Sequence, residues 1–188
     1  MKKYILFISV FCCVAGYWFY EQYVPSVARV NEMPMKLTST AFQDQGMLAI
    51  DYTCHGKNYN PPLTIQGVPQ AAKSLVLITS DPDAPQPQPW IHWVVFNISP
   101  KTTEIPQAAH YLLLEGAKRG KNSVQTLDYY GACPPQGHGI HHYHFMLYAL
   151  DQMLDLPDGV PYDAVIQAMQ GHTITQVDLV GLYETNLV

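Results

Sequence analysis

Three apolar runs, rich in β-branched and aromatic residues, predict main strands of this chain. They cover residues 74–80, 92–98 and 143–150, and residues 173–183 predict a further strand that closes the chain. The run 92–98 is apolar on both faces, which is typical of an inner strand of a sandwich. A shorter run at residues 111–114 predicts a further strand.

Two other segments have patterns of their own. Residues 41–53 predict a hairpin, with Phe42 before a turn at 43–46 and a returning strand at 47–52. Between Pro161 and Gly171, apolar residues recur at the spacing of a helix. These residues are Tyr162, Val165, Ile166 and Met169. Short strands with one or two short helices indicate a mostly β fold, a β-sandwich.

Residues 1–28 stand apart from the predicted fold. Lys2 and Lys3 precede an apolar stretch over residues 4–20, the pattern of a secretory signal. Ser26-Val27-Ala28 offers a small-x-small cleavage site, whereas the aromatic end of the stretch suits an uncleaved anchor. The sequence leaves both alternatives open, a signal peptide or an N-terminal membrane anchor. Either one predicts that residues 29–188 form an exported domain, periplasmic or anchored to the outer face of the inner membrane.

Composition narrows the classes of partner. Of the 188 residues, 48% are hydrophobic and only 13% are charged, which suits one folded domain with a core. The net charge is −5 and no basic run is present, so we expect no nucleic-acid partner. We expect contact with a membrane only through the N-terminal segment or through lipid headgroups.

Two cysteines remain once Cys12 and Cys13 are assigned to the N-terminal segment. A single pair in an oxidising compartment predicts a disulfide between Cys54 and Cys133. The alternative is two buried free thiols.

Polar side chains occur where the predicted strands begin or end. Asp81 follows the run 74–80 and His92 opens the next run, with four prolines between them. If these strands are antiparallel neighbours, both side chains lie at the same end of the sheet. His141 and Tyr143 share one face at the start of a third strand, after a loop rich in Gly and Pro at 131–139. Such groups can hold a small anion, although Asp81 also suits an Asx turn and His92 a core histidine.

Metal and nucleophile chemistry have weaker support. His138, His141, His142 and His144 gather in one window, but only His142 and His144 share a strand face. Two imidazoles are too few for a structural zinc site. Cys133 near His141 suggests a Cys–His nucleophile, yet a disulfide explains Cys133 more simply. We therefore predict no cofactor, no metal and no enzymatic activity.

The chain resembles the phosphatidylethanolamine-binding protein family, in its bacterial Raf-kinase-inhibitor-like branch. The resemblance covers residues 36–184. It includes the segments Cys54-His55-Gly56-Lys57-Asn58, Asp81-Pro82-Asp83-Ala84-Pro85, His92-Trp93-Val94-Val95, Gly131-Ala132-Cys133-Pro134-Pro135, His141-His142-Tyr143 and Gly181-Leu182-Tyr183. Two departures from the family pattern are Ala132, where Pro is usual, and His55, where an acid is usual.

The resemblance implies a Greek-key β-sandwich and an anion pocket that takes phosphate-like groups, including phospholipid headgroups. Its ligand-binding residues would be Asp81, Trp90, His92, Gly131, Pro135, His141 and Tyr143. The first hypothesis is thus a non-enzymatic protein that binds a small phosphate-like anion, with an affinity that depends on histidine protonation. The alternative is a regulator of a protein partner, such as a protease or signalling protein, with the pocket as sensor. A phosphoester hydrolase that uses a His–Asp pair on water ranks third.

Overall fold

The computed structural model describes residues 33–86, 89–109 and 116–185. Its strands are β1 (Lys36–Thr38), β2 (Gly46–Met47), β3 (Leu63–Gln66), β4 (Ser74–Asp81), β5 (Trp90–Ile98), β6 (Glu104–Ile105), β7 (Lys118–Lys121), β8 (His141–Leu150), β9 (Val160–Pro161) and β10 (Thr173–Tyr183). A 3₁₀ turn, η1, spans Ile50–Tyr52, and the helix α2 spans Tyr162–Met169. The predicted signal or anchor at 1–28 and the predicted strand at 111–114 lie outside the described residues.

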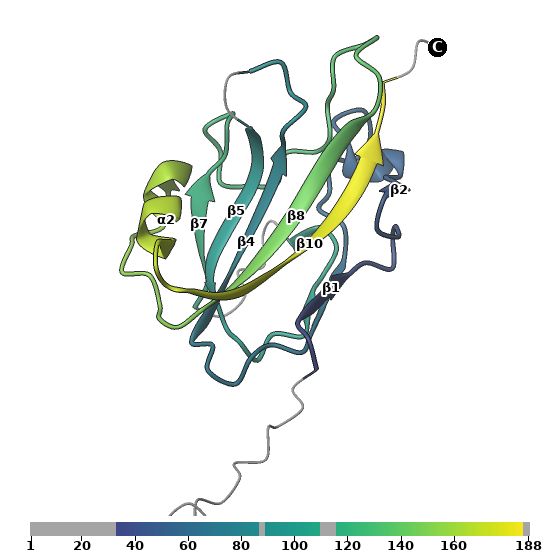
Figure 1. Cartoon of the computed structure of the whole chain (residues 1–188). Coiled ribbons are helices and arrows are strands. Elements are labelled where there is room, and N and C mark those ends of the chain that lie inside the picture. Colours follow the sequence, from purple (N-terminus) through teal and green to yellow (C-terminus); the bar gives the residue numbers. More distant parts are fainter. Residues whose placement is uncertain (1–32, 87–88, 110–115, 186–188) are drawn as a thin grey trace, which may run out of the picture. The chain divides into compact units, whose positions relative to one another are not determined.

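The strands form two sheets. The larger has the order β2-β10-β8-β4-β5-β7-β9, and the smaller has the order β1-β3-β6. The central pairs β10–β8, β8–β4 and β4–β5 are antiparallel, whereas β2 and β9 join the edges in parallel. In Figure 1, α2 lies on the β7 side of the large sheet, and β1 and β2 lie towards β10. The mostly β prediction is confirmed.

Each face of the large sheet has its own apolar core. Leu75 and Leu77 of β4 pack in the core that also holds Leu63 and Ile65 of the small sheet. Their neighbours on the opposite face pack against the helix α2; this second core includes Val76, Ile78, Val165 and Met169. Because β4 and β5 are covered on both faces, their sequences are apolar throughout, as predicted for inner strands.

A β-bulge changes the direction of His92. Thr79 pairs with Trp93 and Ser80 pairs with Ile91, so His92 has no partner in the β4–β5 ladder. An extra residue of this kind re-aims a side chain. Regular alternation along residues 92–98 predicts that His92 shares a face with Val94 and Phe96, and this prediction is wrong. Those two residues belong to the core under α2, whereas the His92 ring lies 5.2 Å from the ring of Tyr143 on the other face.

The predicted hairpin over 41–53 is also wrong. The turn does form, since the Gly46 N–H donates to the Gln43 carbonyl at 2.8 Å. The turn is attached to β10, however, because the Asp44 carboxylate accepts the Val180 N–H at 2.9 Å and the Gln45 N–H donates to the Val180 carbonyl at 2.8 Å. Residues 46–47 then pair in parallel with β10, and the 3₁₀ turn η1 replaces the returning strand.

The helix and the last strand follow their predictions. α2 begins directly after Pro161 and buries Val165 and Met169. β10 covers the predicted span 173–183. Among the described residues, no helix is both long and apolar enough to span a bilayer.

Candidate functional site

The predicted site residues meet at one rim of the large sheet. Asp81 ends β4 and pairs with Trp90, which begins β5. His141 begins β8, the strand on the other side of β4. β4 and β5 are antiparallel neighbours, which is the condition under which the sequence places Asp81 and His92 at the same end of the sheet. Three adjacent strands therefore supply an acid, an indole and two imidazoles to one place.

Asp81 and His141 form a buried pair. The His141 Nδ1–H donates to Asp81 Oδ2 at 2.7 Å. Both residues are buried, since Asp81 is 3% exposed and His141 is 2% exposed. The other carboxylate oxygen of Asp81 accepts the Asp83 N–H at 2.9 Å. This second bond is the Asx turn that the sequence offered as an alternative for Asp81, so the turn and the pairing coexist.

His92 is held by its neighbours in one tautomer. Its Nδ1 lies 2.6 Å from the Tyr130 carbonyl oxygen, which accepts only, so Nδ1 carries the proton. Burial lowers the pKa of His92, despite the opposing effects of the Tyr130 carbonyl and of Asp81. The ring is therefore neutral at pH 7, with a lone pair on Nε2. Within the described part of the chain, this buried Nε2 has no hydrogen-bond partner.

Tyr143 lies between the two imidazoles. Its ring centroid is 5.2 Å from that of His92 and 6.5 Å from that of His141. Burial, together with the nearby Asp81 carboxylate, raises the pKa of Tyr143, so its hydroxyl stays protonated. That hydroxyl is also buried without a hydrogen-bond partner among the residues that the structure describes. The Tyr143 hydroxyl and His92 Nε2 are thus buried polar atoms of two neighbouring rings, and Asp81 and the Cys133 backbone are the groups that act on the Tyr143 hydroxyl.

These groups border a pocket of about 180 Å³. It has room for roughly six water molecules at about 30 Å³ each, and it is smaller than the ~300 Å³ typical of sites for drug-sized ligands. The lining residues are Asp81, Ala84, Pro85, Gln86, Trp90, His92, Tyr130, Cys133, Pro135 and His141. Neither Lys nor Arg is among them. The pocket thus fits a small polar group, and among the described residues that line it Asp81 is the one carboxylate, beside the imidazoles of His92 and His141.

The loop at 131–135 packs tightly on the segment around Thr53. The Gly131 N–H donates to Asn58 Oδ1 at 2.7 Å, and a side chain at Gly131 would meet the Thr53 backbone at 2.7 Å. Ala132 forms a parallel bridge with Thr53. The Ala132 N–H donates to the Tyr52 carbonyl at 3.3 Å. The amides of Gly131 and Ala132 are therefore used within the protein and are not available to a ligand.

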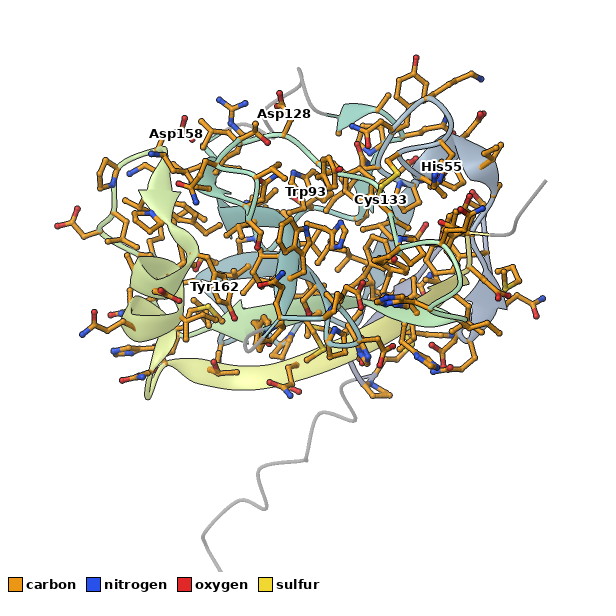
Figure 2. All side chains as sticks on the ribbon, turned by 90° about the horizontal axis from the view of Figure 1, so that it is seen from above. His55, Trp93, Asp128, Cys133, Asp158 and Tyr162 are labelled. Carbon is orange, nitrogen blue, oxygen red and sulfur yellow. A yellow bond between two sulfur atoms is a disulfide. The ribbon has the colours of Figure 1, made fainter. Side chains whose placement is uncertain are left out.

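A disulfide joins the same two segments, the loop at 131–135 and the segment around Thr53. Cys54 and Cys133 are bonded, as the sequence predicted, and Figure 2 shows the yellow bond at Cys133 close to His55. Because Cys133 lines the pocket, the disulfide anchors one wall of it. A bonded Cys133 has no thiol, so the Cys–His nucleophile has no support.

Five of the seven predicted ligand-binding residues line the pocket; these are Asp81, Trp90, His92, Pro135 and His141. Tyr143 and Gly131 lie next to the lining instead of in it. Sequence reasoning missed Tyr130, whose carbonyl orients His92 and whose ring stacks on it at 5.9 Å. The available signal was its position directly before the Gly131 loop. Gln86 also lines the pocket, and no feature of the sequence predicted that position.

The clustered histidines do not converge on one point. His142 bonds to Asp83 and His144 bonds to Asp178, each through Nδ1 at 2.7 Å. Among the described residues, the one group of three with metal-ligand atoms near one another is Cys54, His55 and Cys133. Its two sulfurs are bonded to each other in this structure.

The two-sheet fold, with an acid–imidazole pocket at the rim of the larger sheet, defines a class of β-sandwich domain. Residues 38–184 match the family model described as phosphatidylethanolamine-binding protein. The chain belongs to the phosphatidylethanolamine-binding protein family. The resemblance seen in the motifs around Asp81 and His141 is thereby confirmed.

Similar proteins come from archaea and bacteria. A UPF0098 protein of Methanothermobacter thermautotrophicus is 47% identical over 153 residues, covering 79% of this chain and 98% of the relative. A crystal structure of a family homologue from Chlamydia trachomatis is 39% identical with a TM-score of 0.74, covering 80% and 97% of the two chains. Escherichia coli YbcL, described as a member of the mammalian family, is 30% identical with a TM-score of 0.77, covering 81% and 99%.

Proposed function

We propose that this protein is a non-enzymatic binding protein that holds a small phosphate-like anion in the pocket at the sheet rim. The observation that carries the proposal is the buried Asp81–His141 pair, both members of which line the pocket. Buried ionisable groups that converge in a small cavity are typical of a ligand site. The family name supports the same chemistry, because the headgroup of phosphatidylethanolamine contains a phosphate.

His141 supplies the contact to the anion. Its Nδ1–H is committed to Asp81, which leaves Nε2 without a hydrogen-bond partner among the described residues. When the ring is protonated, Nε2–H can donate to an oxygen of the ligand while Asp81 holds the ring in place. The Trp90 and Pro135 side chains add apolar walls, which strengthen a hydrogen bond by excluding water.

We also infer that the domain acts outside the cytoplasm. This inference is supported by the Cys54–Cys133 disulfide, since disulfides persist in oxidising compartments. It agrees with the charged and apolar pattern of residues 1–28. A ligand met there is either a lipid headgroup or a free phosphate compound.

Calorimetric titration of the full-length protein with phosphate and with phosphoethanolamine tests the anion site. The informative variant is His141→Asn, because the Asn amide can keep a hydrogen bond to Asp81 but has no counterpart of Nε2. The matched control is His144→Asn, since His144 lies on the same strand and pairs with Asp178 on the outer face. We expect heat of binding in the wild type and the control, and none in His141→Asn. A folded wild type that binds neither compound would contradict the proposal.

A further inference from the structure

We propose that Cys54, His55 and Cys133 form a Zn²⁺ site when the disulfide between the two cysteines is reduced. The ligand atoms of these three side chains lie within 4.8 Å of one another, and they are the one such group of His, Cys, Asp or Glu among the described residues. In Figure 2, His55 lies beside the yellow bond at Cys133. The proposal revises the prediction of no metal for the reduced protein. It does not depend on the anion pocket, although Cys133 borders both.

The three ligands suit zinc by their chemical type. Thiolate sulfur and imidazole nitrogen are ligands that Zn²⁺ prefers, whereas Ca²⁺ and Mg²⁺ take oxygen ligands. Two thiolates also balance the charge of the divalent ion. Three protein ligands leave the fourth tetrahedral position to a water molecule, and water reaches the site because His55 is exposed.

His55 already lies at the distance that a tetrahedral zinc site requires. With Zn–S at about 2.3 Å and Zn–N at about 2.0 Å, the sulfur and nitrogen ligands are about 3.6 Å apart. The Cys54 sulfur lies 3.6 Å from His55 Nδ1 and 4.0 Å from Nε2. The Tyr183 hydroxyl lies 3.4 Å from Nδ1, which favours Nε2 as the ligand. Nδ1 then keeps the second hydrogen bond that orients a zinc-bound histidine.

Backbone contacts hold the two cysteines near each other without help from the disulfide. The Cys54 N–H donates to the Ala132 carbonyl at 3.0 Å, and the Ala132 N–H donates to the Tyr52 carbonyl at 3.3 Å. The Cα atoms of Cys54 and Cys133 are 5.4 Å apart. Two thiolates on one zinc ion are about 3.8 Å apart, a separation that rotation of the two side chains can provide. The ligands are thus held close together before the ion binds, which reduces the entropy lost on binding.

The disulfide and the metal ion compete for the same two sulfur atoms. A dithiol reductant gives two electrons and two protons to the disulfide, which becomes two cysteine thiols while the reductant becomes a disulfide. Zn²⁺ then displaces the two thiol protons, which are released to water. An oxidant must remove the ion from the thiolates before the disulfide can form again. Zinc binding therefore opposes oxidation of this pair.

Titration with Zn²⁺ in competition with a coloured chelator tests the site. All samples are full-length protein with Cys12→Ser and Cys13→Ser, so that the thiols of the N-terminal segment do not bind the ion. One sample is reduced with a phosphine, which is oxidised to the phosphine oxide by taking the oxygen of water, and the other keeps its disulfide. Both forms have the same histidines and carboxylates, so the oxidised form is the control for adventitious binding.

We expect one Zn²⁺ per reduced chain, bound at least about 100-fold more tightly than by the oxidised chain. Equal affinity of the two forms would overturn the proposal. The variant His55→Ala distinguishes a three-residue site from a pair of thiols, and it should weaken binding to the reduced protein at least about tenfold. His144→Ala, which removes a partly exposed imidazole on β8, is the matched control and should not change the affinity. Unchanged affinity of His55→Ala would overturn the site as proposed.

Circular dichroism during the titration shows whether the reduced domain is folded. If reduction unfolds it, Zn²⁺ should restore the folded spectrum of the protein with His55 and not that of His55→Ala, since an ion that binds the folded state stabilises it. A reduced chain that stays unfolded in excess Zn²⁺ would overturn the proposal.

The rate of oxidation gives a second measurement. Thiol counting follows the reaction of the reduced protein with a small disulfide, with and without Zn²⁺. The ion should slow oxidation at least about tenfold, because it holds both sulfurs, and it should protect His55→Ala less. Equal rates with and without Zn²⁺ would show that the ion does not bind these sulfurs.

Discussion

The histidines that pair with aspartates in this protein differ in role because they differ in burial. His141, His142, His144 and His172 each place Nδ1 within hydrogen-bond distance of an aspartate. Three of these pairs are at least 30% exposed, and such surface pairs contribute about 0–1 kcal/mol to stability. Only the His141–Asp81 pair is buried. A buried charge without its partner is costly, so this pair holds the end of β4 to the start of β8 at the rim.

His92 should make the stability of the protein depend on pH. Its folded pKa is lowered by burial below the unfolded value of about 6.5. Between those two values the unfolded chain binds more protons, so stability increases as the pH increases. As the pH falls below about 6.5, the wild type should lose up to about 1.4 kcal/mol of unfolding free energy per pH unit because of His92. His92→Gln should lack this contribution.

Urea unfolding of the wild type and of His92→Gln between about pH 5 and pH 7.5 measures the effect. The wild-type free energy minus that of the variant should decrease as the pH decreases. His144→Gln, at a partly exposed position, is the control, so that the effect of the buried ring is separated from the effect of replacing a histidine at all. A constant difference between the wild type and His92→Gln would show that His92 titrates alike in both states.

Much of the site can be read from individual residues, and the rest depends on tertiary contacts. Asp81 and His141 were predictable because each lies at the boundary of a strongly apolar run. The tautomer of His92 was not, since it depends on the Tyr130 carbonyl, 38 positions further along the chain. The use of the Gly131 amide by Asn58 is similarly remote in sequence, at 73 positions.

At the scale of elements, the alternation of apolar and polar residues predicted which side chains are buried wherever a strand is regular. In β8, His141, Tyr143 and Phe145 are buried, whereas His142 is exposed and His144 partly exposed, as alternation predicts. In β5 the bulge at His92 breaks the alternation, and no local signal in the sequence announces it. The prediction of a returning strand at 47–52 was wrong for another reason. Asp44 and Gln45 bond to β10, which lies more than a hundred positions away in the sequence.

The contact between the pocket loop and the Thr53 segment should tolerate no side chain at Gly131. A methyl group there would lie 2.7 Å from the Thr53 carbonyl carbon and 2.8 Å from Asn58 Oδ1, so the backbones must move apart. We expect Gly131→Ala to lower the free energy of unfolding by about 1–3 kcal/mol, the usual cost of overpacking. Phosphate binding should also weaken, because Cys133 and Pro135 of the same loop line the pocket.

Chemical denaturation and phosphate titration of the same protein sample give both values. Gln136→Ala is the matched control, since Gln136 is an exposed residue of the same loop. It should leave stability and binding close to those of the wild type. Wild-type affinity in a destabilised Gly131→Ala would show that the loop does not position the pocket wall.

At the scale of the whole molecule, the two cores and the disulfide connect distant parts of the chain. The sequence predicted a sandwich, and it predicted the disulfide from export and cysteine number, without geometry. It did not show that the Cys54–Cys133 bond lies at the pocket. That position follows from the parallel bridge between Thr53 and Ala132, which brings two loops together beside the sheet rim. The Cys54–Cys133 bond therefore restricts the whole chain and also fixes one wall of the pocket.

The disulfide should contribute more to the stability of the whole domain than any surface pair. It joins residues 79 positions apart, and closing a loop of that size restricts the unfolded chain by up to about 4.5 kcal/mol in the chain-entropy model. We expect the double variant Cys54→Ser/Cys133→Ser to lose about 2–4 kcal/mol of unfolding free energy, the usual measured range. Urea unfolding with and without a dithiol reductant provides the measurement and its control. The reductant should destabilise the wild type towards the level of the variant and leave the variant unchanged, whereas equal stability of the oxidised wild type and the variant would contradict the prediction.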